Sequence, residues 1–425
     1  MNLLASHVVL LAIVAVSILL MLIRPRGLPE VWWVGSGALL LVLLRLVPLQ
    51  LAGHAVAEGL DVYLFLIGMM LLSGLADTFG VFDWVAAAAV RAAHGSRSRL
   101  FLLLYAIGTV TTVFLSNDAT AVVLTPAILV AIRKAKVPPL PYVFACALIA
   151  NAASFVLPIS NPANLVVFRE GMPSLGRWLV AFGLASLLSI AVTFLVLRFY
   201  FRTDFGGEMD SDVKTVALSR EGKMVLGGVA LTVLALLAAS LLHAKLGWPT
   251  CVAAVVITLA VCVFARKNPI TIAGGISWAT LALVAGLFVL VDAVISIGAL
   301  RWTQTALHAV EALPPLPSAL VTGFTVGFAN NLVNNLPAGL IVGATIDAAH
   351  VHGLLVHAVL LGIDLGPNLS VTGSLATILW LLALRKEDVQ VSFFDFLKVG
   401  ALAMPAALAC AICGAWLTEA AIKMF

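Results

Sequence analysis

Residues 114–126 read FLSNDATAVVLTP, and this stretch places an aspartate, Asp118, between two apolar runs. A charged side chain is costly in the hydrocarbon core of a membrane, so an aspartate in such surroundings indicates a functional role. Ser116, Asn117 and Thr120 beside it add polar groups that interrupt the apolar pattern. The stretch therefore predicts a break between two apolar helical segments, and its meaning depends on the rest of the chain.

Composition indicates what surrounds this stretch. Of the 425 residues, 62% are hydrophobic and only 10% are charged, with a net charge of +4. A soluble chain has roughly 25% charged residues. Apolar runs here repeatedly reach the ~20 residues that a helix needs to cross a bilayer. We therefore predict an all-α polytopic protein embedded in the lipid bilayer. Its basic residues lie in loops between spans and do not indicate nucleic-acid binding.

Ten apolar runs and two longer, interrupted segments make up the predicted membrane part. The first run has no basic residues before it and no small-residue cleavage site after it, so we expect a retained span and not a signal peptide. The interrupted segments, 99–134 and 316–350, are each either two full spans or a re-entrant hairpin, and their polar breaks favour hairpins. The spans lie near 3–23, 31–50, 61–90, 141–168, 177–201, 222–243, 248–265, 279–310, 353–384 and 394–422.

The distribution of basic residues predicts the orientation. Basic loops stay on the cytoplasmic side of a membrane. Most of the 24 Lys and Arg residues become cytoplasmic if the N-terminus lies outside. Two full spans in place of each hairpin would give the same result. We therefore expect a multi-pass protein of the cytoplasmic (inner) membrane, with both termini outside.

The chain also resembles itself at one constant offset. Gly68, Gly80, Trp84, Asn117 and Ser116 fall on Gly286, Gly298, Trp302, Asn335 and Asn334, respectively. This predicts two repeats, 1–201 and 222–425, joined by a cytoplasmic linker over 202–221. Each repeat holds five spans, one of them broken, plus one re-entrant hairpin. Because five is odd, the second repeat crosses the membrane in the opposite sense, an inverted-topology repeat typical of secondary transporters.

Four polar breaks fall at matching places in the two repeats. The hairpin tips are 116–120 and 330–337, and the broken spans are interrupted at 151–164 and 364–374. Non-helical backbone at membrane depth persists only where protein or water satisfies it. We expect the four breaks to meet near the midplane around one polar cavity. A lone Asn in a span more often joins helices, but Asn117 and Asn335 recur beside turns in both repeats.

Asp118 and Asp364 are the strongest candidates for a chemical role. Neither break contains Lys or Arg, and burial of a carboxyl group without a basic partner favours its neutral form. Such groups are candidate proton carriers. Asp77 and Asp292 also lie within spans but do not align across the repeats, so for these two a structural or supporting role is equally expected.

The type of polar group limits the cargo and the activity. Asparagine amides both donate and accept hydrogen bonds, which suits a neutral solute that carries hydroxyl groups. A di- or tricarboxylate could still bind at the N-termini of half-helices. The sequence contains no HExxH, GxSxG or Walker P-loop pattern, so protease, hydrolase and built-in ATPase activities are not indicated.

Three stretches, SNDATAVVLTP, NNLPAG and GIDLGPNLSVTGSLATILW, resemble the arsenite/antimonite efflux permeases (ArsB type) of the ion transporter superfamily. The resemblance covers nearly the whole chain. Sodium-coupled dicarboxylate carriers of that superfamily typically have Ser-Asn-Thr at both hairpin tips. Here the tips read Ser-Asn-Asp and Asn-Asn-Leu, which makes those carriers the poorer match.

The resemblance implies export of arsenite and antimonite, as neutral trihydroxides, in exchange for protons. It implies no cofactor and no metal beyond the transported metalloid. Some members work with a cytoplasmic arsenite-stimulated ATPase. Oligomeric state is left open. Asp118 and Asp364 would carry protons. The implied cargo contacts are Asn117, Thr120, Ser160, Asn161, Asn335, Thr372 and Ser374, with Ser116, Asn151, Asn164, Asn331, Asn334 and Asn368 supporting them.

Several alternatives stay open from the sequence. A sodium/proton antiporter or a sodium-coupled carboxylate transporter of the same superfamily is the second candidate function. An ion channel is less expected, because channels usually gather four or more like subunits or rings around a pore. Cys410 and Cys413 share one face of the last span, and trivalent arsenic binds thiols. We expect these two to pack as small apolar residues.

Overall fold

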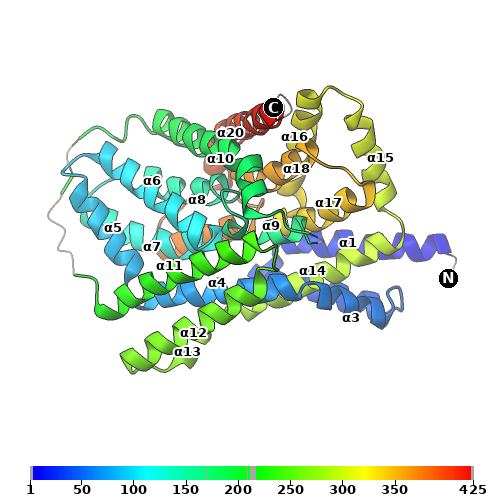
Figure 1. Cartoon of the computed structure of the whole chain (residues 1–425), viewed down its shortest axis with the longest axis horizontal. Coiled ribbons are helices and arrows are strands. Elements are labelled where there is room, and N and C mark those ends of the chain that lie inside the picture. Colours follow the sequence, from blue (N-terminus) through cyan, green and yellow to red (C-terminus); the bar gives the residue numbers. More distant parts are fainter. Residues whose placement is uncertain (1–2, 170, 208, 211–216, 423–425) are drawn as a thin grey trace.

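The computed structural model describes residues 3–169, 171–207, 209–210 and 217–422. Within these residues every regular element is a helix (Figure 1). Nine of the described helices are long and apolar enough to cross a membrane, since 19 residues span about 28 Å. The prediction of an all-α polytopic membrane protein is confirmed. These helices are α1 (Leu3–Ile23), α4 (Leu60–Thr78), α6 (Arg97–Phe114), α10 (Leu175–Tyr200), α11 (Arg220–Leu241), α12 (Gly247–Ala265), α14 (Trp278–Ser296), α16 (Pro315–Val333) and α20 (Phe393–Ile422).

Shorter helices connect these spans or form parts of broken ones. They are α2 (Glu30–Leu43), α3 (Leu49–Glu58), α5 (Val81–Ala92), α7 (Thr125–Lys134), α8 (Leu140–Ala152), α9 (Pro162–Val167), α13 (Pro269–Ala273), α15 (Leu300–Glu311), α17 (Asn335–Ala349), α18 (Leu354–Leu365) and α19 (Leu375–Lys386). A π-helical segment, Ala119–Leu124, leads into α7.

Two predicted spans are each a pair of helices. The predicted span 61–90 divides into α4 and α5 at Gly80, and the predicted span 279–310 divides into α14 and α15 at Gly298. Both glycines have positive φ, 68° and 78°, a conformation that a residue with a Cβ atom adopts only at a cost. The predicted span 31–50 is also interrupted. Its helix ends at Leu43, and residues 49–58 form α3 after Pro48.

Each interrupted segment forms a helix, a tight tip and a second helical arm. The tips are Ser116 and Asn334, with φ angles of 129° and 75°. The second arm of the second hairpin, α17, has 15 residues, about 22 Å of helix. That is shorter than a full span, but the first arm, α16, has 19 residues and is long enough to cross a membrane. The depth of the hairpins in a membrane stays a prediction.

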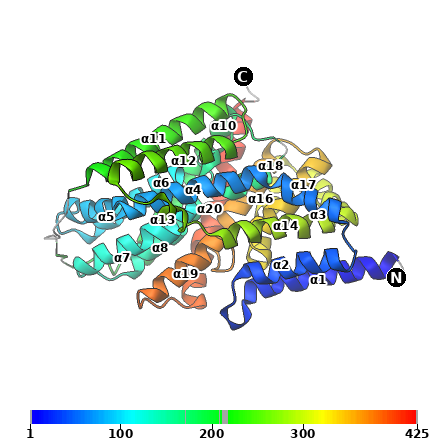
Figure 2. The ribbon, with the colours of Figure 1, turned by 90° about the horizontal axis from the view of Figure 1, so that it is seen from below.

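Equivalent elements of the two halves make equivalent contacts. α4 packs on α12 where a Cβ on Gly68 would lie 2.7 Å from Thr250 Cγ2, and α14 packs on α2 where a Cβ on Gly286 would lie 2.8 Å from Val34 Cγ1. α1 with α2, and α11 with α12, lie at opposite edges of the molecule (Figure 2). These contacts are what an inverted repeat would produce. The division at 202–221 stays a prediction.

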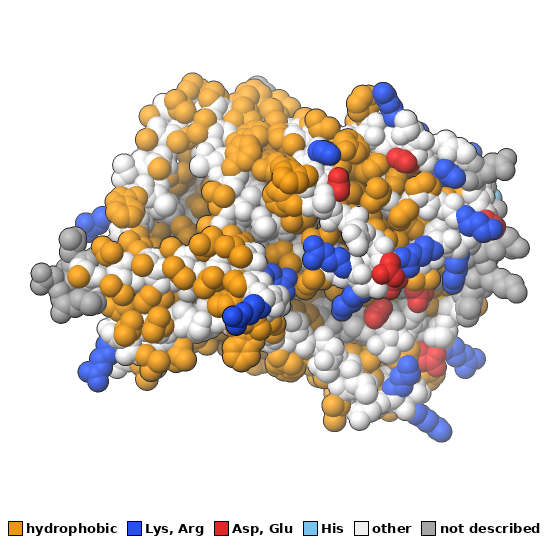
Figure 3. Space-filling view, turned by 180° about the vertical axis from the view of Figure 1, so that it is seen from behind, with side chains coloured by type: hydrophobic (Ala, Val, Ile, Leu, Met, Phe, Trp, Pro, Cys, Tyr) orange, Lys and Arg blue, Asp and Glu red, His pale blue; other side chains and the backbone are white. Residues whose placement is uncertain are grey.

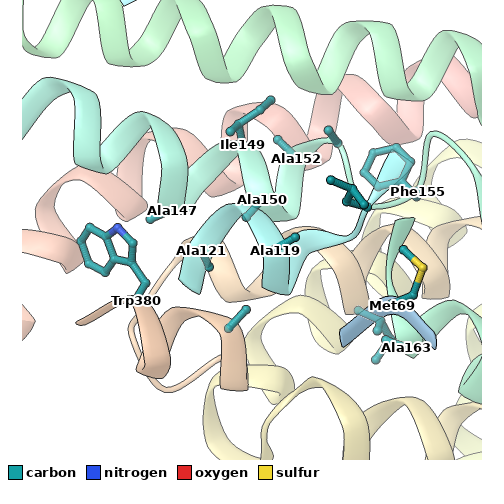
Figure 4. Packing of buried hydrophobic residues seen from close by; sticks show 14 of the residues in the cluster. Met69, Ala119, Ala121, Ala147, Ile149, Ala150, Ala152, Phe155, Ala163 and Trp380 are labelled. Carbon is teal, nitrogen blue, oxygen red and sulfur yellow. The ribbon is translucent and has the colours of Figure 1, made fainter. Parts of the chain in front are cut away.

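The surface and the interior fit a bilayer setting. Hydrophobic side chains cover much of the face in Figure 3, and charged side chains gather mainly toward the end that holds α5 and α7. Inside, small residues let backbones approach closely. Figure 4 shows Ala119 and Ala121 of the π-helical segment beside Ala147 and Ala150 of α8. This close packing positions the first hairpin tip against the broken span α8–α9.

Candidate functional site

The first hairpin tip starts its second arm with side-chain caps. The Ser116 hydroxyl accepts a hydrogen bond from the Ala119 N–H at 3.4 Å, and Asn117 Oδ1 accepts one from the Asp118 N–H at 2.9 Å. Both bonds satisfy amide groups that a helix start leaves without partners. The Asp118 carboxylate itself forms no hydrogen bond or ion pair with the described residues. The tip is ordered by its neighbours and presents a carboxylate to open space.

That space is a cavity of about 300 Å³ between the tip and the helices that face it. Its polar lining includes Ser116 and Asp118 on the tip and Ser73 and Asp77 on α4. Pro162 at the start of α9 also borders it. Among the described residues, those that line the cavity include two carboxylates and no Lys or Arg. The remaining lining residues are Leu66, Met69, Met70, Gly74, Thr78, Ala119, Val122, Val123, Thr271, Ile272, Gly275, Ser277, Thr280, Leu375 and Leu379.

The second hairpin tip has different surroundings. Asn334 Oδ1 accepts from the Leu336 N–H at 3.5 Å, and Asn334 Nδ2 donates to the Thr372 carbonyl at 3.4 Å. The Asn335 N–H donates to the Gly373 carbonyl at 3.0 Å. Thr372 Oγ1 donates to the Asn331 carbonyl at 3.0 Å. The tip is therefore bonded directly to the break between α18 and α19.

Asn331 adds further bonds to this closed contact. Its Nδ2 donates to the carbonyls of Gly327 at 2.9 Å and Gly366 at 3.0 Å. Its Oδ1 accepts from the Ser370 hydroxyl at 2.6 Å. Asn330 Nδ2 donates to the Ile363 carbonyl at 2.7 Å. Carbonyls freed where α18 ends are thus satisfied by amides of α16.

The two broken spans are joined to each other. Asn161 Nδ2 donates to Asp364 Oδ1 at 2.6 Å, and Asn151 Nδ2 donates to Asn368 Oδ1 at 2.9 Å. Asn368 Nδ2 returns a bond to the Leu148 carbonyl at 3.0 Å. Asp364 is fully buried, and its Oδ2 has no hydrogen-bond partner among the described residues. This carboxyl group ties the two halves of the chain together.

The remaining predicted contacts are also buried and bonded. Asn161 Oδ1 accepts from the Ala163 N–H at 3.0 Å at the start of α9, and Ser374 Oγ accepts from the Thr377 N–H at 3.1 Å at the start of α19. Ser160 Oγ donates to the Val113 carbonyl at 3.0 Å, and Asn164 Nδ2 donates to the Ser154 carbonyl at 3.0 Å. The Thr120 and Thr112 hydroxyls lie 2.8 Å apart.

The structure thus brings the four breaks into one polar region, but not around one shared space. Ser116 and Asp118 line the cavity. Asn117, Thr120, Ser160, Asn161, Asn335, Thr372 and Ser374, predicted as cargo contacts, are not among the residues that line it. They take part in the hydrogen bonds described above. Cys410 and Cys413 lie on α20, also away from the cavity.

The polar groups across the cavity from the tip were not predicted as site residues. Asp77 is exposed near the end of α4, and Thr280 lies in the first turn of α14 beside its cap, Ser277. For Asp77 the sequence predicts a structural or a supporting role equally, because this residue has no counterpart in the second repeat. Its place at the cavity depends on the packing of α4 against the first hairpin, and no signal in the sequence gives that contact.

Comparison with known proteins now bears on this geometry. The protein-family model described as "Citrate transporter" (CitMHS) matches residues 3–365. The chain belongs to this family. The "Arsenical pump membrane protein" of Escherichia coli (strain K12) is 27% identical over 414 residues, covering 92% of this chain and 94% of that protein. The "Putative arsenical pump membrane protein" of Bacillus subtilis (strain 168) is 23% identical over 410 residues, covering 90% and 93%.

One solved structure shows the fold. The Alcanivorax borkumensis YdaH transporter, whose crystal structure is described as having an unusual topology, matches with a TM-score of 0.57 at 14% identity, over 90% of this chain and 89% of that one. The predicted resemblance to arsenical pump membrane proteins is confirmed as a similarity over most of the chain. This chain is a membrane transporter.

Proposed function

We propose that this transporter exports arsenite and antimonite from the cytoplasm, as neutral trihydroxides, in exchange for protons. The observation that carries the proposal is the cavity at the first hairpin tip. Its described lining has the carboxylates of Asp77 and Asp118 together with several hydroxyl groups, and it lacks Lys and Arg. Carboxylates accept hydrogen bonds from a trihydroxide, whereas a citrate anion would meet like charges. The names of the two arsenical pump relatives support the same cargo.

Asp118 is the group through which we propose that protons are coupled. A neutral cargo offers the membrane potential no charge, so a titrating group must supply the coupling. Asp118 faces the cavity without a bonded partner, which leaves it free to exchange a proton with the solution. Asp364 is the second proposed proton carrier. A proton on it would weaken the bond that it accepts from Asn161 and so loosen the contact between the two breaks.

In the predicted orientation, this cavity opens toward the cytoplasm, where the cargo would bind. Asp77 lies near the end of α4, and α5 follows and ends near Arg91. Thr271, which also lines the cavity, follows Lys267 closely in sequence. Both basic residues fall on the predicted cytoplasmic side. Cargo would therefore enter from the cytoplasm, as efflux requires.

Arsenite accumulation in proteoliposomes with an imposed pH gradient tests the proposal. We expect accumulation that follows the proton gradient and is unchanged when sodium is replaced by choline. No ATPase is added, so the same measurement tests whether the chain works without the partner that the resemblance implies for some members. Absence of arsenite movement under a verified gradient would overturn the proposal.

A sodium-coupled carboxylate transporter is the second candidate, favoured by the description of the matching family model. Citrate or succinate uptake that requires sodium, in the same vesicles, would move the function to this candidate. Sodium/proton exchange without any organic cargo would indicate the antiporter. Either result would change the assigned cargo and would not affect the description of the fold.

A further inference from the structure

A cluster of charged side chains lies away from the cavity and has no role in the function proposed above. Arg169 Nη1 lies 3.5 Å from Glu58 Oε2 and 3.8 Å from Asp292 Oδ1. His54 Nδ1 lies 3.2 Å from Glu58 Oε1. The side chains of Arg169 and Asp292 are only 19% and 12% exposed, so these ion pairs are partly shielded from water. One guanidinium thus joins two carboxylates from different helices.

Three helices, α4, α14 and α9, run from the cavity to this cluster, which lies at their far ends. α4 carries Asp77 at its cavity end and begins two residues after Glu58, which separates the two by about 28 Å of helix. α14 carries Thr280 at the cavity and Asp292 about 18 Å further along. α9 begins at Pro162, which borders the cavity, and Arg169 follows its last turn.

The ion pairs join two parts of the molecule that meet at the cavity. Arg169 follows α9, which packs on α17 and is fixed through Asn161 to Asp364. Glu58 ends α3 and Asp292 lies on α14, and these two helices pack on each other. Arg169 is therefore the charged link between the broken spans and the α3–α14 pair.

We propose that Arg169 is a positioning residue that holds the far end of the site closed while the cavity is open. The inference rests on the transport step of the proposed function and not on the identity of the cargo, because any transporter must expose its site to each side in turn. For the broken spans to move along α4 and α14, the guanidinium must leave Glu58 and Asp292. While they last, these ion pairs favour the conformation with the open cavity. Breaking them is part of the step that exposes cargo to the other side.

One ligand atom from each of His54, Glu58 and Asp292 lies within 4.8 Å of the other two, a spacing that could hold a metal ion. The guanidinium of Arg169 contacts both carboxylates, so in this conformation the cluster is an ion-pair network. Variants that remove Arg169 could gain a metal ion in its place. Every measurement on them is therefore made in the presence of EDTA.

Thiol labelling tests the proposal without any cargo. A cysteine introduced as Ser73→Cys lines the cavity, in a background whose five native cysteines are replaced by alanine. Its rate of reaction with a membrane-impermeant maleimide, added on the cavity side, reports how often the cavity is open. We expect Arg169→Gln and Arg169→Glu to lower that rate at least threefold. Arg169→Lys, which keeps the charge, is the matched control and should lower it by less than half.

Charge reversal separates pairing from general loss of structure. The double variant Arg169→Glu with Asp292→Arg restores opposite charges and should recover most of the labelling rate that Arg169→Glu loses. Each variant is first checked for a single symmetric peak in size-exclusion chromatography. Should Arg169→Glu fail that check, Glu58→Gln with Asp292→Asn takes its place and should lower the rate as Arg169→Gln does.

The possible results distinguish the positioning role of Arg169 from the proposed export of arsenite. Labelling rates that stay within 1.5-fold of the parent in Arg169→Gln overturn the role of Arg169, whatever the cargo is. A double variant that remains as slow as Arg169→Glu also overturns it, because the pairing would then not set the conformation. If labelling changes as expected but arsenite does not accumulate, the positioning role stands and the proposed cargo falls.

Discussion

Ser116 and Asn334 stand at the tips of two hairpins that align in sequence, and both have positive φ angles, 129° and 75°. In both, a side-chain oxygen caps the arm that follows. Their surroundings differ. The first tip presents Asp118 to a cavity of about 300 Å³. The second is bonded through Asn331 and Asn334 to the break beside it, which contains Thr372.

This difference shows how two similar segments can have different roles in one conformation. The local backbone is determined by the residues of each tip, so it recurs. The exposure of the side chains on each tip is determined by the elements that face that tip. Of the two tips, the first lines the cavity beside α4 and α14. An inverted-repeat transporter would exchange the surroundings of its two tips as it moves. The comparison therefore leads to tests of each tip and of the carboxylates near it.

The largest expected effect is at Asp118. Asp118→Asn keeps the size of the side chain and removes its ability to carry a proton, so arsenite accumulation driven by a pH gradient should fall by at least about tenfold. Asp118→Glu, which keeps the carboxyl group, should retain a measurable part. Initial rates in proteoliposomes provide the measurement. Undiminished gradient-driven accumulation in Asp118→Asn would assign proton coupling to another group.

A smaller loss is expected at Asp364, which contacts no open space in this conformation. In Asp364→Asn the amide oxygen can still accept the bond from Asn161, so the protein should fold and elute normally. If Asp364 carries a second proton, gradient-driven transport should fall several-fold, while arsenite exchange at equal pH on both sides should continue. Equal rates for the variant and the parent in both assays would leave Asp364 with a purely structural role.

The second tip should be the more sensitive of the two to loss of a side chain. Asn331→Ala removes two donated bonds and one accepted bond, and each such bond contributes about 0.5–1.5 kcal/mol. The Gly366 carbonyl keeps the bond that it accepts from the Leu369 N–H. Ser116→Ala removes one long bond at 3.4 Å, worth about 0.5–1 kcal/mol. Thermal unfolding in detergent should show the larger drop in Tm for Asn331→Ala. The reverse order would mean that the closed contact of the second tip contributes little stability.

Selectivity should respond to Asp77 on the helix that faces the first tip. Asp77→Asn removes one of the two negative charges that line the cavity, and one such charge about 4 Å from a bound anion repels it by about 1 kcal/mol where water screens the pair. Citrate should then inhibit arsenite transport with a roughly fivefold lower inhibition constant. Asp395→Asn, in the first turn of α20 and outside this cavity, is the matched control. An unchanged inhibition constant would show that Asp77 does not act on the cargo.

Much of this arrangement follows from local pattern, and the rest depends on contacts between distant segments. The apolar runs predict the spans, and the polar interruptions predict the hairpin tips and both broken helices. The turns at Gly80 and Gly298 were missed, because glycine is frequent in membrane helices and a single one does not mark a turn. The position of Asp77 was missed for another reason. It faces Asp118 only because α4 packs against the hairpin, and no spacing in the sequence encodes that contact.

The pairing of Arg169 illustrates the same limit. Arg169 meets Glu58 across 111 residues of sequence, and it meets Asp292 from the other half of the chain. In the sequence, each of these three residues is a single charge at or near the end of a span, which is common at a membrane surface. Their meeting depends on how α3, α9 and α14 are placed, and that placement comes from packing of the whole molecule.

The smallest expected effect tests whether the two halves are equivalent where they turn. Gly80 and Gly298 both have positive φ, and a Cβ atom would find no neighbour within 4 Å at Gly80 and only Arg301 Nε at 3.8 Å at Gly298. Alanine at either position therefore costs the backbone penalty alone, about 1–2 kcal/mol. Gly80→Ala and Gly298→Ala should lower Tm by similar amounts, with Gly68→Ala, which would clash with Thr250, as the more damaging control. A much larger drop for one of the two turns would show that the halves are not equivalent there, and that one turn has a packing role that the other lacks.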